Sequence, residues 1–185
     1  TGAGNDHADV EALSGRLGNV LAGQVSVDAG AGSNEFHLSE AACTAGDVLT
    51  IYASQILGEG PFPFLINYVA TGGTFSNVQV TTGSNDDWLR VRGKPPVPFM
   101  IDTGAGNDVM DVYVSPTSFY SNLWLDGGAG SNSLTAFDLT GGYGVGAVMA
   151  NSATSGDLRV TYFGMFVSDL LFQNVPWGGV RVKPA

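Results

Sequence analysis

Acidic and amide side chains recur at two positions of a short glycine-rich motif. The motif reads DAGAGSN at residues 28–34, DTGAGND at 102–108 and DGGAGSN at 126–132. Carboxylate and amide oxygens are ligands that Ca²⁺ prefers, so stacked copies would offer a calcium site. Asp and Asn in turns also accept hydrogen bonds from the backbone N–H groups of the turn, which is the alternative role. The side chains concerned are Asp28, Asn34, Asp102, Asp108, Asp126 and Asn132.

A second group of charged residues surrounds a tryptophan just before the proline-rich segment 94–98. Acids beside basic residues on one strand suit the binding or cleavage of an acidic sugar, and glycoside hydrolysis needs two carboxylates at a defined separation. The alternative is a solvated strand face with ion pairs. The chain has no Gly-x-Ser-x-Gly, P-loop or zinc-helix motif, and we predict that it is not an enzyme. The glycan-binding candidates are Asp86, Asp87, Trp88, Arg90 and Arg92.

Histidines and aromatic residues supply the remaining candidates. His7 and His37 follow separate copies of the motif at related positions, so they are either a metal pair or two surface imidazoles. Several aromatic residues would form a sugar-stacking strip or, alternatively, pack in the core. They are Trp88, Tyr113, Phe119, Tyr120 and Trp124.

Composition limits the classes of partner. The 185 residues include 17 acidic and 7 basic side chains, which gives a net charge of −10. Nucleic acids and anionic membrane surfaces bind through Lys and Arg, so neither is expected as a partner. No apolar stretch approaches the roughly 20 residues needed to cross a bilayer, so no membrane insertion is expected. Cys43 is the only cysteine, which excludes an intrachain disulfide.

The glycine-rich motif marks an internal repeat. Counted from the first residue of the seven-residue motif, the copies start at 28, 80, 102 and 126, at intervals of 52, 22 and 24 residues. TGAGND at 1–6 is a further copy. We interpret the interval of 52 as two units, one of which has lost its glycines near 51–55. Apolar residues alternate with polar ones on both sides of each copy, which predicts a strand before and after each turn. The apolar pairs are Val25/Val27, Val78/Val80, Phe99/Ile101 and Leu123/Leu125 before the turn, and Ala8/Val10, Phe36/Leu38, Met110/Val112 and Leu134/Ala136 after it.

Two strands, a turn and a return path in 22–28 residues correspond to one rung of a parallel β-solenoid. A single rung cannot bury its inward side chains, whereas stacked rungs build a continuous core. We therefore predict an all-β fold, a parallel β-helix or β-solenoid, as one domain over residues 1–185. An antiparallel β-sandwich with glycine turns is the alternative. Residues 10–21 also have apolar residues at helical spacing, so a short helix is considered there.

The segment GAGNDVMDV at 104–112 resembles the glycine- and aspartate-rich repeat of secreted RTX (haemolysin-type) calcium-binding proteins. More broadly, the repeat spacing is similar to that of bacterial surface and adhesin-like β-solenoid proteins. In the RTX family, tandem nonapeptides form a β-roll whose adjacent turns share calcium ions, and this resemblance implies Ca²⁺ as the cofactor. In this chain the copies stand 22 to 28 residues apart.

These observations favour a secreted structural module that assembles end to end into a fibre, an extracellular matrix or a surface layer, located outside the cell or on its surface. An unfinished solenoid end exposes unpaired backbone, and the acidic residues 1–60 and mildly basic residues 151–185 suit head-to-tail contact. The partner would then be a second copy. Two alternatives stay open: a glycan-binding or glycan-cleaving β-helix protein, and a passive stalk segment of a large adhesin. The chain begins without Met, so we expect a processed subunit or a piece of a longer protein.

Overall fold

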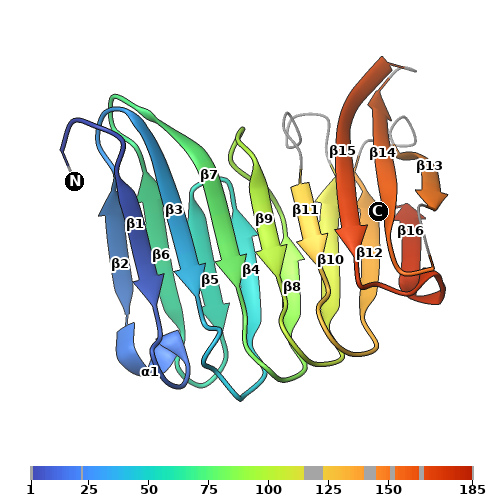
Figure 1. The fold of residues 1–185 in the computed structure, drawn as a ribbon, viewed down its shortest axis with the longest axis horizontal. Helices are drawn as coiled ribbons and strands as arrows, with labels where there is room; N and C mark the ends of the chain where they lie inside the picture. The colour runs from blue at the N-terminus through green and yellow to red at the C-terminus, as the bar shows by residue number, and fades with distance from the viewer. Residues whose placement is uncertain are drawn as a thin grey trace.

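The protein folds into two eight-stranded sheets that form two layers with the core between them (Figure 1). The structure, a computed structural model, describes residues 2–21, 23–114, 123–139, 145–150, 153–162 and 165–184. The first sheet has the spatial order β1 (His7–Glu11), β3 (Ser33–Ser39), β7 (Thr74–Thr81), β9 (Phe99–Asp102), β11 (Leu123–Asp126), β15 (Met165–Gln173), β14 (Gly156–Tyr162) and β13 (Val145–Ala150). The second has the order β16 (Val180–Pro184), β12 (Ser133–Asp138), β10 (Val109–Val114), β8 (Trp88–Val91), β4 (Val48–Tyr52), β5 (Gln55–Glu59), β6 (Phe64–Val69) and β2 (Gln24–Asp28).

Most neighbouring strands within each sheet are parallel and in register. Ile101 on β9 pairs with Val80 on β7 on one side and with Leu125 on β11 on the other, as the repeat predicts. Among the described strands, antiparallel pairs occur within β4–β5–β6 and within β13–β14–β15. The prediction of an all-β fold is confirmed, and the two stacked layers also fit the sandwich alternative.

Alternation along the strands builds the core. Every second residue points between the sheets, and the predicted apolar pairs of the inner strands are nearly inaccessible to solvent. Each such aliphatic or aromatic side chain contributes roughly 1.5–3 kcal/mol when buried. The large side chains that are fully buried include Leu17, Phe36, Leu38, Leu49, Ile51, Ile56, Ile66, Tyr68, Leu89, Phe99 and Ile101.

The chain passes from one sheet to the other at two edges of the molecule. The upper turn edge in Figure 1 contains the turns 2–6, 29–32 and 70–73, which lead into first-sheet strands. At the lower turn edge the chain leaves the first sheet for the second, through residues 40–47, 82–87, 103–108 and 127–132. The motif copies are therefore divided between the two edges, and they do not form the single stack that the repeat suggested.

The interpretation of the 52-residue interval is wrong. Between the copies at 28 and 80 the chain runs through β3, then through the antiparallel strands β4, β5 and β6 of the second sheet, and then through β7. The interval thus covers one and a half circuits and a hairpin, and no unit with lost glycines lies near 51–55. The half circuit explains why later copies lie at the opposite edge.

The connection from β1 to β2 contains the short helix α1 (Leu17–Leu21), and a single 3₁₀ turn, η1 (Trp177–Gly179), precedes β16. The helical spacing over residues 10–21 is realised only in this one turn and a half, because Val10 and Glu11 belong to β1. No helix in the described part of the chain is long and apolar enough to pass through a bilayer.

Candidate functional site

The first aspartate of each complete motif caps its own turn. Asp102 Oδ1 accepts a hydrogen bond from the backbone N–H of Gly104 at 2.9 Å, and Asp126 Oδ1 accepts one from Gly128 at 2.9 Å. Asp28 Oδ1 likewise accepts from a glycine two residues later, and the N–H of Thr71 in the next turn also donates to it at 2.9 Å. Hydrogen bonds from the Thr71 N–H and then the glycine N–H lower the pKa of Asp28.

The last polar residue of each lower turn connects that turn to its neighbour. The N–H of Asp47 donates to Asp87 Oδ1 at 2.7 Å, and the N–H of Asp87 donates to Asp108 Oδ1 at 2.8 Å. The N–H of Asp108 donates to Asn132 Oδ1 at 2.9 Å. We call these four residues the lower Asp/Asn ladder. All four are buried, with exposed fractions of 8% or less. The side chains of Asp87, Asp108 and Asn132 each satisfy a backbone donor that would otherwise be buried without a partner.

Burial dominates the electrostatics of this ladder. It raises the pKa of Asp87 to about 6 and also raises the pKa values of Asp47 and Asp108. Glu40, which is fully buried close by, has its pKa raised to about 7 by the same effect. Arg16 Nε lies 3.0 Å from Asp47 Oδ1, and the cavity beside this ion pair holds about 10 Å³, room for at most one water molecule. The ladder therefore has the geometry of a structural element and offers no room for a substrate.

The motif residues do not fit a shared calcium site. Asp28 and Asn34 lie at the upper turn edge, whereas the other four candidates lie at the lower one. Asn34 Oδ1 is occupied by the N–H of Asp6 at 2.9 Å, just as the lower side chains are occupied by N–H groups. In the ranges that the structure describes, no three His, Cys, Asp or Glu residues are grouped to hold a metal ion. The four candidates at the lower edge are Asp102, Asp108, Asp126 and Asn132. Hydrogen bonds to backbone N–H groups of the turns account for their side chains.

The glycan-binding candidates are separated into two places. Asp87 belongs to the buried ladder, and Asp86 at the exposed lower edge accepts a hydrogen bond from the N–H of Asn107 at 2.7 Å. Trp88 and Arg90 instead point outward from β8 on the second sheet, and Arg92 is exposed just after that strand. The predicted carboxylates are thus not opposed across a cleft, as glycoside hydrolysis would require.

Arg90 is held in place on this outer face. Its guanidinium carbon lies 3.9 Å from the centre of the Trp88 ring. Its Nη1 atom lies 3.0 Å from both carboxylate oxygens of Glu59 on β5. Trp88 also donates from Nε1 to Asp111 Oδ2 at 2.9 Å. The predicted ion pairing on a solvated strand face is present.

Next to these residues a row of four side chains crosses the second sheet. Arg92 lies over the ring of Tyr113 at 4.5 Å, Tyr113 stacks on Phe137 at 4.9 Å with an interplanar angle of 13°, and Lys183 lies over Phe137 at 5.8 Å. We call Arg92, Tyr113, Phe137 and Lys183 the cation–aromatic row. Phe137 and Lys183 are not among the residues predicted from the sequence to form a site. The alternation of inward and outward residues along each strand could have indicated them. Phe137 lies two residues after the outward Thr135, and Lys183 lies two residues after the outward Arg181.

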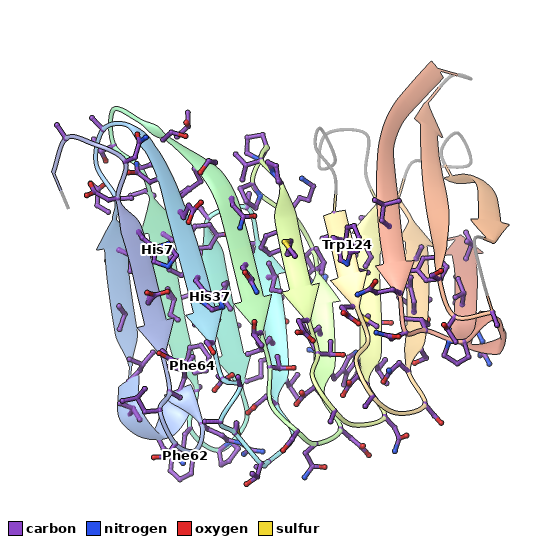
Figure 2. The ribbon with its side chains drawn as sticks, viewed as in Figure 1. His7, His37, Phe62, Phe64 and Trp124 are labelled. Atoms are coloured by element: carbon purple, nitrogen blue, oxygen red, sulfur yellow. The ribbon has the colours of Figure 1, made fainter. Side chains whose placement is uncertain are left out.

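The predicted aromatic strip is divided. Trp124 lies on β11 of the first sheet, the layer opposite Trp88 and Tyr113 (Figure 2). Phe119 and Tyr120 lie outside the described residues. Trp88 and Tyr113 on one sheet and Trp124 on the other therefore do not form one continuous stacking surface.

His7 and His37 lie on the neighbouring strands β1 and β3 of the first sheet (Figure 2). His7 Nδ1 lies 3.0 Å from Glu35 Oε2 and its Nε2 lies 2.9 Å from Asp9 Oδ1, so both ring nitrogens have acidic partners. His37 Nδ1 lies 3.4 Å from the same Asp9 oxygen. The hydrogen bonds to Glu35 and then to Asp9 raise the pKa of His7. In this acid–histidine cluster, both His7 nitrogens and His37 Nδ1 face carboxylates, His37 Nε2 faces the Thr81 hydroxyl, and no ring nitrogen faces the other histidine.

The two ends of the double layer carry strands of matching direction. At one end β1 and β2 are the edge strands, and at the other end the edges are β13 and β16. Since β13 is antiparallel to β14 and β14 is antiparallel to β15, which continues the parallel ladder, β13 runs in the same direction as β1. In the second sheet, β16 is parallel to β4 through β12, β10 and β8. Because β5 is antiparallel to both β4 and β6, and β6 is parallel to β2, β16 runs in the same direction as β2.

The end formed by β1 and β2 is incompletely covered. Val10, Val25 and Val27 point toward the core but are only half-buried, whereas Leu38 and Ile66 on the adjacent strands are fully buried. On the connection between the two edge strands, Leu13 and Val20 have 83% and 65% of their surface exposed. Apolar surface is therefore concentrated at this end.

Backbone donors are also open at this end. The N–H of Ala12 donates to Ser39 O and the N–H of Ala29 donates to Val69 O. In a strand, successive N–H groups point alternately to the two neighbouring strands, so those of Asp9 on β1 and Ser26 on β2 point away from the sheets. These edges are unpaired templates for another strand.

A scan against protein-family models finds no match, and a search of curated proteins finds none either.

Proposed function

We propose that this chain is a β-solenoid module that stacks head to tail with further copies of itself and so builds an extracellular fibre, matrix or surface layer. The observation that carries the proposal is the matched direction of the edge strands at the two ends. A second copy translated along the stacking direction would bring its β13 beside β1 and its β16 beside β2. Both new pairs would then be parallel, like those inside the molecule.

Stacking would complete the open end. It would cover Val10, Val25 and Val27, which are half-buried in the single chain, and each side chain that becomes buried contributes roughly 1.5–3 kcal/mol at most. It would also give partners to the outward N–H groups of Asp9 and Ser26. Because the two joined surfaces differ, the contact is heterologous, and such contacts propagate into filaments unless a ring closes.

Charge favours the same polarity. The end formed by β1 and β2 carries Asp9, Glu11 and Asp28, and β16, which would lie beside β2 of the next copy, carries Arg181 and Lys183. Opposite charges orient approaching molecules and raise the association rate more than the affinity. Head-to-tail approach is therefore favoured over head-to-head approach, which would bring like charges together.

An extracellular location belongs to this proposal. The chain is rich in glycine and has few charged residues, and its GAGND turns resemble those of secreted RTX and adhesin-like repeat proteins. In this chain the resemblance has a structural meaning, because the Asp and Asn side chains of the turns hold neighbouring coils together. A stalk segment of a large adhesin would use the same stacking within one longer polypeptide.

The experiment changes backbone donors at the open edges without touching the core. Asp9→Pro combined with Ser26→Pro removes the two outward N–H groups, and Asp9→Asn combined with Ser26→Ala changes the same side chains but keeps both donors. We expect wild type and the Asn/Ala control to form concentration-dependent oligomers and filaments in light scattering and electron microscopy. The proline variant should keep the β-type circular dichroism spectrum and stay monomeric.

Two results would overturn the proposal. One is a wild-type chain that stays monomeric at millimolar concentration, which would favour the stalk alternative. The other is a proline variant that assembles as well as the control, because assembly would then not use the open edges.

A further inference from the structure

Four of the seven basic side chains of this acidic protein lie on one face. Arg90, Arg92, Arg181 and Lys183 project from the outer side of the second sheet, and the whole chain contains only 7 Lys and Arg against 17 acids. Salt screens charges beyond about 8 Å at physiological ionic strength. A ligand on this face therefore responds to the local cations more than to the net charge of −10.

Aromatic rings position two of these cations without neutralising them. Arg92 lies over Tyr113 and Lys183 lies over Phe137, at the two ends of the cation–aromatic row. Among the described residues, neither cation has a carboxylate within the 4.0 Å of an ion pair, whereas Arg90 is paired with Glu59. A cation–π contact leaves the charge available to an anion on the solvent side.

This arrangement is preorganised for anions. Fixing an Arg or Lys side chain costs about 1.5–2 kcal/mol of conformational entropy. Stacking on the rings already restricts these side chains, so less entropy is lost when a ligand binds. The stacked rings are themselves fixed by cross-strand packing of Tyr113 against Phe137. The row thus presents two fixed positive charges on a rigid sheet.

The spacing of the charges indicates the class of ligand. From the end of β8 to β16 the row crosses three strand intervals, which is about 14 Å at ~4.8 Å per interval. Double-stranded DNA carries one charge per about 1.7 Å, so this acidic protein with a few separated cations would be a poor match for it. A linear chain with one carboxylate per sugar is less densely charged and can pair with Arg and Lys at intervals.

We infer that the outer face of the second sheet binds an anionic polysaccharide of the polyuronate class, whose carboxylates pair with Arg92 and Lys183. The face lies on the outer side of the second sheet, so it stays open when copies stack at their ends. Binding at this face therefore does not depend on the proposed head-to-tail assembly, and the two proposals fail separately. Binding here would attach an extracellular structure to an acidic glycan layer.

The test uses sodium polygalacturonate as the probe and neutral dextran as its uncharged counterpart. Binding of the full chain is measured by calorimetry at low salt and by affinity electrophoresis. Arg92→Gln combined with Lys183→Gln should weaken polygalacturonate binding at least tenfold. The control Asn77→Asp combined with Gln79→Glu, on the outer face of the first sheet, alters the net charge by the same amount and should leave binding within twofold of wild type.

A second variant tests the role of the rings. Tyr113→Leu removes the ring under Arg92 and keeps the cation, so we expect a two- to fivefold weaker binding with an unchanged dependence on salt. Circular dichroism checks that each variant is folded.

Three outcomes would overturn the inference. Wild type that binds neither polymer has no such site, and equal binding of dextran and polygalacturonate removes the role of charge. Polygalacturonate binding that is unchanged in the Arg92→Gln and Lys183→Gln variant would show that the polymer does not bind at this row.

Discussion

The glycine turn at residues 2–6 and the one at residues 127–132 have nearly the same sequence but different surroundings. A Cβ atom on Gly130 would lie 1.7 Å from the carbonyl oxygen of Gly106 in the neighbouring turn, whereas a Cβ atom on Gly4 would meet nothing within 4 Å. Their φ angles are almost identical, +136° and +137°. The turn 2–6 is stacked on the turn 29–32 on one side only. The comparison therefore separates two requirements for glycine: a local backbone conformation, and a close approach that exists only where a further turn lies on the side of the Cβ.

The largest expected effect tests this separation directly. Gly130→Ala combines an unfavourable φ with a collision against backbone, so we expect it to cost more than about 4 kcal/mol of unfolding free energy or to prevent folding. Gly4→Ala has the conformational cost alone, about 1–3 kcal/mol. Urea denaturation of both variants measures the difference. Equal losses would mean that stacking adds nothing to the demand for glycine.

A smaller effect is expected from the amide side chains of the same two turns. Asn132 is buried; its Oδ1 accepts from the N–H of Asp108, and its Nδ2 donates to the carbonyl oxygens of Gly127 and Asn174. Asn132→Ala should cost about 2–4 kcal/mol, because it leaves buried backbone groups without partners. Asn5 is exposed and accepts one bond, from Ser33, so Asn5→Ala should cost about 1 kcal/mol. Chemical denaturation that ranks them in the opposite order would contradict the comparison.

The smallest predicted effect is a gain in stability that depends on pH. Asp87 and Asp108 take the place in the lower Asp/Asn ladder that Asn132 occupies one turn later, so Asp87→Asn and Asp108→Asn should keep the Oδ1 acceptor and remove a buried charge. At pH 8 we expect the melting temperature of each variant to rise by roughly 2–6 °C. Asp86→Asn, next to the ladder but exposed, is the control and should change little.

The pH dependence follows from the raised pKa values. The folded state binds the proton of Asp87 up to a pKa of about 6 and that of Glu40 up to about 7, whereas the unfolded chain releases both near pH 4. These groups therefore favour folding most below pH 4, and that contribution is lost as the pH rises from 4 to 7. The advantage of the Asn variants should disappear near pH 4. A melting temperature of the wild type that increases steadily between pH 4 and 7 would contradict the raised pKa values.

Much of the local structure could be predicted from sequence. Alternation at period two identified inward residues such as Ile101 and Leu125, and the two pair in register on adjacent strands. The turn-capping role of Asp102 and Asp126 was one of the two alternatives that the motif offered. These features depend on neighbours within a few residues, or on repetition of the same short pattern, so they can be predicted from the sequence.

The candidate sites were less predictable. The motif places a turn between two strands but does not say whether the chain is leaving the first sheet or the second. Asp28 ends a strand of the second sheet and Asp102 ends a strand of the first, so the two lie at opposite edges. Asp87 was predicted beside Trp88 and Arg90 as part of one charged face, yet alternation and the turn bury it in the ladder.

The amino-acid sequence alone determined that this chain forms strands with one buried face, joined by tight turns that need glycine. It also determined the negative net charge and the scarcity of cations. The tertiary structure decided which turns are stacked, which carboxylates are desolvated, and that Arg92 and Lys183 lie at the ends of one aromatic row. The reason is physical: a strand's pattern and a turn's backbone angles are local, whereas burial and cross-strand neighbours depend on the path of the whole chain.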